Sequence, residues 1–292
     1  MMAKKNIQRI MIDGGFTCPN RDGKISRGGC TYCRNDAFAP EYCRKHSSIR
    51  EQIEAGKEFF KGKYETMEYD AYFQSYSGTY ADIATLQQRY NEALSVKDVT
   101  GLVIGTRPDC LGEDILNLLD TYNTRTRLEV EIGVESCTDR VLRRINRGHD
   151  FACAEDAIRR TASRGIRVGV HIILGLPGET FEEMLHGADI LSSLPVNAIK
   201  LHQLQIQHGT AMAEDYRLHP KDYHIFSTAE EYASLAVEFA SRLRPDIKIG
   251  RIVSECPPDM LIAPRWGLKP SVIQKMFESK LREKTLKGEN TA

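Results

Sequence analysis

Short apolar runs alternate with amphipathic stretches along most of the chain. The apolar runs, which are typical of strands, occupy residues 8–12, 69–74, 100–105, 128–134, 167–174 and 198–206. Apolar residues recur with helical spacing between them, over residues 49–61, 83–94, 113–122, 154–163 and 181–191. Strands that alternate with helices predict an α/β fold with a parallel sheet. Right-handed crossovers would curl that sheet into a partial or full parallel (β/α) barrel.

The pattern changes near residue 246. We expect one barrel domain over residues 1–246 and a small C-terminal extension over residues 247–292. A strand-like run at 247–253 and a final helix near 271–284 would make up most of the extension. The sequence between the two parts is not of low complexity, so we expect no flexible linker there.

Composition narrows the class of protein. The 292 residues are 41% hydrophobic and 27% charged, which fits a soluble globular protein. No apolar run approaches the roughly 20 residues that span a bilayer, and the N-terminal residues do not read as a secretory signal. We therefore expect a cytoplasmic protein without membrane contact, whose eight cysteines stay reduced. A formal net charge of zero means that nucleic-acid binding would need a local basic patch.

Three cysteines lie close together near the start of the chain, at Cys18, Cys30 and Cys33 in CPNRDGKISRGGCTYC. Three thiolates can hold three irons of a [4Fe–4S] cluster and leave the fourth iron open to a small molecule. A zinc site that recruits Cys43, or cysteines packed as small hydrophobic residues, would suit the same spacing. The spacing alone does not decide between a cluster and zinc.

Candidate polar residues follow five successive strands. The cysteine loop follows the first strand, residues 75–79 the second, Arg107 the third, Glu135 the fourth and residues 175–179 the fifth. The carboxyl ends of parallel barrel strands meet at one mouth, where chemistry gathers. A zinc knuckle would not require this convergence, so the arrangement favours the cluster.

The cysteine segment resembles the cluster loop of radical S-adenosylmethionine (SAM) enzymes in its CPNRDG and GGCTYC strings. It is most similar to the subgroup related to the catalytic subunit of Elongator, whose first cysteine gap is unusually long. The likeness continues through YFQSYSGTYA, IGTRPDCL, EIGVESC, INRGHD, HIILGLPGET and IKLHQLQIQHGT. The resemblance implies a [4Fe–4S] cluster and SAM as cofactors, with a reductant such as flavodoxin or ferredoxin as partner. The reduced cluster would cleave SAM to methionine and a 5′-deoxyadenosyl radical, which abstracts hydrogen from the substrate.

Several residues match positions that hold SAM in radical SAM enzymes. Tyr32, directly before the third cysteine, would pack near the adenine, unless it only fills the loop. Ser77 and Thr79 stand where relatives contact the SAM ammonium, although ordinary loop hydroxyls explain them equally well. Gly175 begins the GLPGET turn, whose backbone would pass alongside the adenine as it starts a helix.

Charged residues complete the SAM site that the resemblance implies. Glu135 stands where many relatives have glutamine, and it would accept a hydrogen bond from the SAM ribose. Glu129, Glu131 and Glu135 alternate on one strand face, so their burial would require arginines or a cationic ligand beside them. Arg147 would pair with the SAM carboxylate, and a plain surface salt bridge is the alternative.

Arg107 in GTRPD is the candidate for substrate contact, and we assign Arg107 and Glu135 as catalytic residues. An arginine at a closed mouth needs an anion, which would be the substrate, the SAM carboxylate or Asp109. The Elongator likeness implies tRNA as partner, with Arg107 holding a carboxymethylaminomethyl group on the wobble uridine. The alternatives are an oxidoreductase or ligase for a small metabolite, and a zinc-stabilised scaffold.

The remaining candidates each have two interpretations. Arginine-rich stretches at residues 140–147 and 159–167 would contact RNA phosphates or, more commonly, form a solvated charged surface. His171 is either a cavity residue or a satisfied core histidine. Cys256 either approaches the mouth or is an inert thiol.

Overall fold

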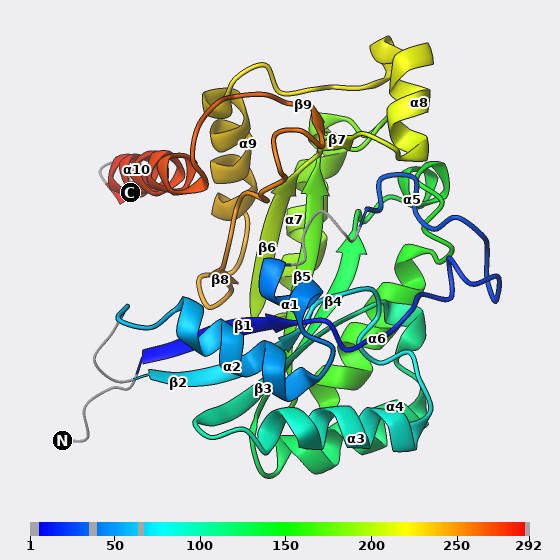
Figure 1. The fold of residues 1–292 in the computed structure, drawn as a ribbon. Coiled ribbons are helices and arrows are strands. Elements are labelled where there is room, and N and C mark those ends of the chain that lie inside the picture. Colours follow the sequence, from blue (N-terminus) through cyan, green and yellow to red (C-terminus); the bar gives the residue numbers. More distant parts are fainter. Residues whose placement is uncertain (1–5, 35–39, 64–66, 290–292) are drawn as a thin grey trace.

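The computed structural model describes residues 6–34, 40–63 and 67–289, and its central feature is a curled parallel sheet (Figure 1). The strand order is β1–β2–β3–β4–β5–β6–β8, so neighbours in the sheet follow one another along the chain. The strands are β1 (Asn6–Ile12), β2 (Met67–Phe73), β3 (Val99–Thr106), β4 (Arg127–Glu135), β5 (Arg167–Leu174), β6 (Ala198–Gln203) and β8 (Lys248–Ile249). The sheet curls into half a barrel, which confirms the prediction of a partial (β/α) barrel.

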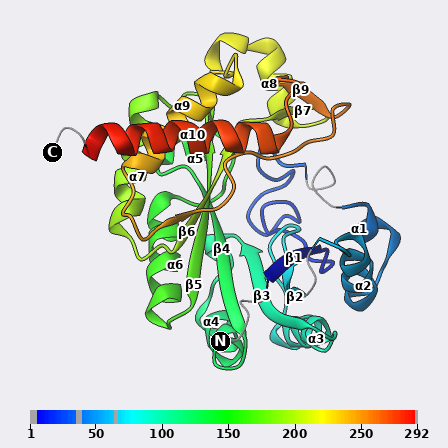
Figure 2. The ribbon, with the colours of Figure 1, turned by 90° about the vertical axis from the view of Figure 1, so that its left-hand side faces the viewer.

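Helices cover the outer face of the half barrel (Figure 2). The α-helices are α1 (Glu41–Lys45), α2 (Ile49–Phe59), α3 (Ile83–Leu94), α4 (Glu113–Asn123), α5 (Asp139–Arg144), α6 (Phe151–Ser163), α7 (Phe181–Ser193), α8 (Ala211–Leu218), α9 (Ala229–Ser241) and α10 (Pro270–Glu289), with short 3-10 turns η2 (Pro108–Cys110) and η3 (Pro220–Asp222). The start of α7 shows why the chain turns helical there, because Thr180 and Glu183 cap each other's backbone amides. None of the described helices is long and apolar enough to cross a membrane.

The strands have one apolar face and one polar face. In β4, Leu128 and Val130 are buried against the helices, whereas Glu129 and Glu131 lie on the concave face. Arg9 of β1 reaches both carboxylates, with N–O distances of 3.0 and 2.6 Å. The period of two along RLEVEIGVE therefore places charged side chains inside the half barrel. The expectation that these carboxylates meet an arginine is correct.

The C-terminal segment joins the half barrel. β8 pairs with β6 in parallel, and Phe277 of α10 is 2% exposed in the same core as the barrel residues. The predicted strand at 198–206 ends earlier, at Gln203, and a separate strand β7 (Ile206–Gln207) pairs antiparallel with β9 (Leu261–Ala263). Helices α8 and α9 are absent from the sequence-based prediction. The domain boundary at residue 246 stays a prediction.

Candidate active site

A cavity of about 170 Å³ opens where the carboxyl ends of the central strands meet the cysteine loop. Its walls come from the loop after β1, from strands β4 and β5, from the carboxyl ends of β2 and β3 with the segments that follow them, and from the segment after α5. The sequence-predicted site residues that line it are Cys18, Cys30, Tyr32, Cys33, Arg107, Glu135 and Arg147. The structure therefore brings together side chains that are far apart in the sequence.

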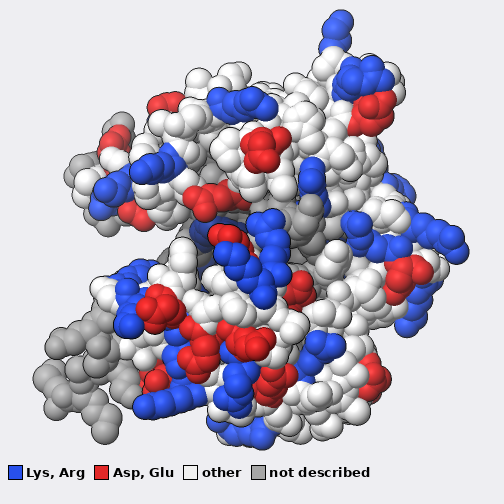
Figure 3. Space-filling model, in the orientation of Figure 1, with Lys and Arg blue, Asp and Glu red and all other residues white. Residues whose placement is uncertain are grey.

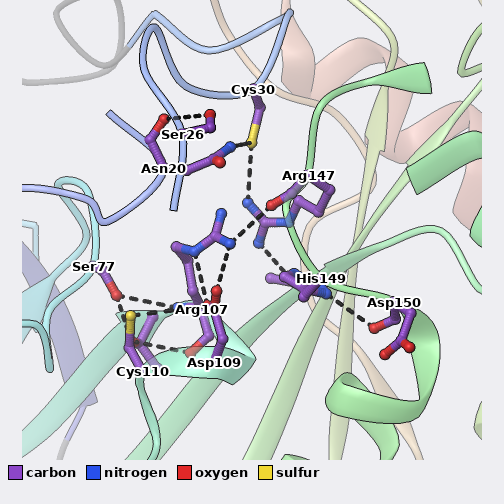
Figure 4. A network of polar contacts seen from close by, with 12 residues as sticks. Asn20, Ser26, Cys30, Ser77, Arg107, Asp109, Cys110, Arg147, His149 and Asp150 are labelled. Atoms are coloured by element: carbon purple, nitrogen blue, oxygen red, sulfur yellow. Dashed lines mark hydrogen bonds and ion pairs between the residues drawn. The ribbon is translucent and has the colours of Figure 1, made fainter. Parts of the chain in front are cut away.

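Hydrogen bonds fix the cysteine loop against the segment after α5. The carbonyl of Cys18 accepts two backbone N–H groups from the turn that follows it, at 2.8 and 3.1 Å. The side-chain amide of Asn20 donates to the carbonyl of Asn146 at 2.6 Å and to the Cys30 sulfur at 3.5 Å (Figure 4). Asn20 is not among the predicted site residues, yet it connects the loop to the neighbourhood of Arg147.

The three cysteines of the loop line the cavity together, and Cys43 does not. Burial raises the pKa of Cys33 to about 11, so this thiol stays protonated at neutral pH until a metal replaces the proton. Within the part of the chain that the structure describes, no three His, Cys, Asp or Glu side chains are grouped to hold one ion. Cys43 lies outside the cavity, where its thiol donates to the carbonyl of Met11 at 3.3 Å. Cys43 is therefore not placed to complete a four-thiolate zinc site.

Unpaired polar atoms surround the cysteines. Asn20 Oδ1, Arg107 Nη1 and Arg147 Nε are buried and have no hydrogen-bond partner among the described residues. Arg107 and Arg147 both line the cavity, and buried polar atoms normally have partners, so their two unpaired nitrogens indicate that a polar group belongs there. The carboxylate of SAM would accept hydrogen bonds from guanidinium nitrogens of this kind.

Arg147 connects the cysteine loop to β4. Its guanidinium donates to the Cys30 sulfur at 3.4 Å and to the carbonyl of Gly133 at 2.6 Å, and it lies 3.4 Å from the Glu135 carboxylate. A Cβ atom at Gly133 would lie 2.6 Å from an Arg147 nitrogen, so this position favours glycine. Glu135 has a φ of 68°, a strained conformation that follows a register shift in β4. Arg147 is 6% exposed, which excludes the surface salt bridge.

Arg107 is paired within the protein. Its Nε and Nη2 donate to the two oxygens of Asp109 at 2.8 and 2.7 Å, and Nη2 also donates to the Arg147 carbonyl at 2.8 Å. Figure 4 shows the guanidinium between Asp109 and the cysteine loop. Of the three anions considered for Arg107, the structure contains the contact with Asp109. Nη1 of Arg107 is the nitrogen left for a ligand. Substrate contact by Arg107 stays a prediction.

Three residues predicted to contact SAM do not line the cavity. The hydroxyls of Ser77 and Thr79 are bonded to the Thr106 hydroxyl at 2.8 and 2.6 Å, which fixes the loop after β2 to the end of β3. Gly175 has a φ of 93° and packs against the ring of Phe226. These contacts favour loop packing, and the role of Ser77, Thr79 and Gly175 in SAM binding stays a prediction.

A second polar cluster lies deeper in the cavity. The buried carboxylate of Glu131 has Arg9, Tyr72, His171 and Lys200 as hydrogen-bond partners, at 2.6, 2.5, 2.9 and 2.7 Å. Burial by itself would raise the pKa of Glu131, but His171 and Lys200 hold it well below its ordinary value. Strand alternation identified Glu131, whereas Tyr72 and Lys200 lie in the YFQSYSGTYA and IKLHQLQIQHGT strings but were not singled out as site residues. His171 lines the cavity, so of its two interpretations the structure supports that of a cavity residue.

Neither arginine-rich stretch forms a free basic face. Most of these arginines are neutralised on the surface by neighbouring acidic residues, and Arg147 points into the cavity. The ion pairs are Arg140–Glu183, Arg144–Asp222, Arg159–Glu155, Arg160–Asp156 and Arg164–Glu113. The contact between these stretches and RNA phosphates is therefore not supported, and the solvated-surface interpretation holds.

Comparison with known families agrees with this geometry. The sequence profile of the radical SAM superfamily matches residues 18–190, including all three cysteines of the loop. The chain belongs to the radical SAM superfamily. The profile of the radical SAM C-terminal domain matches residues 196–283. The protein is thus a radical SAM enzyme whose cofactors are a [4Fe–4S] cluster and SAM, and it needs a reductant.

The chain is similar in sequence to several bacterial and archaeal proteins. Protein YhcC of Escherichia coli K12 is 36% identical over 266 residues, which are 90% of this chain and 83% of YhcC. The uncharacterized protein YtqA of Bacillus subtilis 168 is 34% identical over 260 residues, which are 89% of this chain and 80% of YtqA. The tRNA uridine(34) acetyltransferase of Methanocaldococcus infernus is 26% identical over 213 residues, which are 68% of this chain and 36% of that enzyme.

A solved structure shares the fold. The archaeal Methanocaldococcus infernus Elp3 with an N-terminal deletion has a TM-score of 0.72 to this chain at 16% sequence identity. The match covers 95% of this chain and 64% of the Elp3 chain. The chain therefore has the radical SAM portion of that architecture and spans under two thirds of its length.

The bound cofactors supply a carbon radical that abstracts hydrogen from an unreactive position. The chain's own residues hold and shield this chemistry. Cys18, Cys30 and Cys33 would hold the cluster, and the unpaired nitrogens of Arg107 and Arg147 would bind acid oxygens beside it. Packed helices close the outer face of the half barrel, so access to the centre is from the concave side.

Proposed function

We propose that this radical SAM enzyme modifies a wobble uridine of tRNA whose 5-substituent ends in a carboxylate, as carboxymethylaminomethyl does. The radical would abstract hydrogen from a carbon of that substituent, in the cytoplasm, with flavodoxin or ferredoxin as electron donor. The relative named tRNA uridine(34) acetyltransferase supports the proposal because its name specifies the wobble uridine. The shared fold with Elp3 is consistent with it.

The observation that carries the proposal is the rim of the cavity. Tyr76 lines it and is 37% exposed, with a strained φ of 58° and the Arg21 guanidinium 5.8 Å from its ring centre. Lys24 lies 5.3 Å from the centre of the neighbouring Tyr80 ring. Tyr80 is half-buried, but an exposed ring such as Tyr76 beside basic side chains is suited to stacking an unpaired base and contacting phosphates. A substrate small enough to enter the cavity whole would not need this rim.

The reaction tests the proposal directly. Protein reconstituted with iron and sulfide, then given dithionite and SAM, should release 5′-deoxyadenosine faster with tRNA that carries the acidic wobble substituent than with its unmodified transcript. Cys30→Ala should abolish release with either RNA and keep the circular dichroism of the folded protein. Unchanged tRNA nucleosides in cells that lack the protein, with no stimulation by tRNA in vitro, would favour a small metabolite instead.

The rim has its own test. Tyr76→Ala should weaken tRNA binding roughly 10-fold, because stacking contributes about 1–3 kcal/mol per base. Tyr76→Phe keeps the ring and should bind almost as the parent does. Equal binding by Tyr76→Ala and the parent, measured by filter binding at fixed salt, would remove the rim from the argument.

A further inference from the structure

The concave face of the half barrel has an excess of positive charge beside the cavity. Arg9 and Lys200 contact the Glu131 carboxylate at 2.6 and 2.7 Å, and Arg9 also contacts Glu129 at 3.0 Å. Arg167 also lies 3.8 Å from Glu129, so three cations face two carboxylates in this group. Arg251, which follows β8 in the chain, adds a further positive charge near Lys200.

Arg251 makes no ion pair with the residues that the structure describes. Its side chain is partly buried, and the described residues provide no hydrogen-bond partner for its Nε. Burial lowers the pKa of Lys200, and the charges of Arg9 and Arg251 lower it further. Burial also lowers the pKa of His202, with His171 and Arg251 adding to the effect. An arginine that faces other cations in a partly buried site favours a bound anion.

The backbone around Arg251 is firmly held beside β6. The Leu201 amide donates to the Arg251 carbonyl at 2.8 Å. The Gln203 side chain accepts from the Ser254 amide at 2.9 Å and donates to the Ser254 carbonyl at 3.0 Å. The Ser254 hydroxyl is bonded to Nδ1 of His202 at 2.5 Å. The imidazole and the arginine are therefore fixed in one wall.

His202 joins this wall to the cavity. Its ring centre is 5.1 Å from that of His171, which lines the cavity with the three cysteines, and its Nε2 has no partner in the described part of the chain. Figure 3 shows a hollow between α10 and the β1 side of the molecule, with Lys and Arg side chains inside it. Lys200 contacts Glu131, which precedes Glu135 along β4. This wall therefore lies farther from the carboxyl ends of the strands than the cysteine loop does.

We propose that Arg251, Lys200 and His202 form a subsite that binds the carboxylate of the substrate. Arg107 is a poor anchor for that group, since Asp109 already takes two of its nitrogens. The subsite adjoins the cavity through His171, which lines the cavity and has its ring centre 5.1 Å from that of His202, so a short substituent that ends in a carboxylate would reach the subsite while phosphates stay at the rim. The identity of the carboxylate as the uridine 5-substituent rests on the proposed function.

Two matched anticodon stem-loops test the subsite. One has a 5-carboxymethylaminomethyl wobble uridine, and the other has the neutral amide of the same group. The intact enzyme should bind the acid roughly 10- to 100-fold more tightly, as a charge-assisted pair predicts. Arg251→Met should remove this preference and keep amide binding, and Arg251→Lys should retain part of it. Arg242→Met, which removes an exposed pair between the end of α9 and Asp189 of α7, is the control and should behave as the parent.

Two outcomes would overturn the subsite. One is an undiminished acid preference in Arg251→Met. The other is an equal loss of binding for both RNAs, which would show a structural role only. If the intact enzyme binds neither RNA, the proposed function fails, and the subsite is judged without RNA.

That separate judgement uses full-length protein labelled with 15N-arginine. Millimolar acetate should shift the Arg251 side-chain resonance, which Arg251→Lys identifies by its loss, and acetamide should not. An unmoved resonance would refute the subsite whatever the RNA result. A shift with acetate alone would support the subsite even for a different carboxylate substrate.

Discussion

At the scale of single residues, the site depends on two buried arginines, each of which forms an ion pair with one carboxylate. Arg107 has Asp109 and Arg147 has Glu135, and the backbone of Arg147 also accepts from Arg107. Two guanidinium groups so close together repel each other, which the paired carboxylates offset. The nitrogens left over are those that face the cysteines. The same pairs therefore stabilise the apoprotein and leave donors for a ligand.

Arg147→Met should lower the free energy of unfolding by about 3 kcal/mol, because it leaves the Glu135 carboxylate without its counter-ion. The side chains are 8% and 12% exposed, so water cannot fully replace the pair. Urea unfolding of the metal-free protein measures the loss, and adding Glu135→Gln should recover part of it. Arg143→Met, at an exposed position on α5, should change stability by less than about 0.5 kcal/mol. A loss that small in Arg147→Met would contradict the pairing argument.

At the scale of elements, the turn from β5 into α7 keeps a carboxyl group buried. The Ser136 hydroxyl, just after β4, donates to the Glu179 carboxylate in this turn. Burial raises the pKa of Glu179 to about 7, although the hydrogen bond from Ser136 acts in the opposite direction. The contact ties the end of β4 to the start of α7 and couples that junction to pH.

The raised pKa predicts that stability decreases as pH rises. The folded protein binds this proton more tightly than the unfolded chain, in which the carboxyl pKa returns to 4.5. The free energy of unfolding should therefore fall between about pH 4.5 and 7, by up to about 3 kcal/mol, and then level off. Glu179→Gln should flatten this difference between urea curves at pH 5 and pH 8. An identical decline in parent and variant would exclude Glu179 as its source.

Features that depend on local sequence could be predicted, whereas features that depend on tertiary contacts could not. Short apolar runs sufficed to predict six strands, and a period of two sufficed for the inward charges of β4, because both are local properties. The end of β6 depends on a bond from Gln203 to Ser254, 51 residues later. Arg107 was recognisable as a cation at the mouth of the barrel. Its hydrogen bond to the Arg147 carbonyl could not be predicted, because that residue is 40 positions away in the sequence. The deep polar cluster likewise forms only when separate strands meet.

At the scale of the whole molecule, the C-terminal segment is part of the barrel's packing. Trp266 donates its indole N–H to the Phe226 carbonyl at 2.9 Å and stacks on Tyr232 with ring centres 5.6 Å apart. Phe277 of α10 packs in the core that also contains the sheet residues. The same segment supplies β8 and Arg251. We therefore expect the extension to fold together with the barrel core.

Phe277→Ala should destabilise the entire molecule by about 4 kcal/mol, because it removes a fully buried ring and leaves a cavity between α10 and the barrel core. The loss should appear as one earlier transition in urea, followed by tryptophan fluorescence and by circular dichroism together. Val272→Ala, 43% exposed on the same helix, should leave that transition almost in place. Two separate transitions, with only the smaller one moved by Phe277→Ala, would show instead that residues 247–292 unfold as an independent unit.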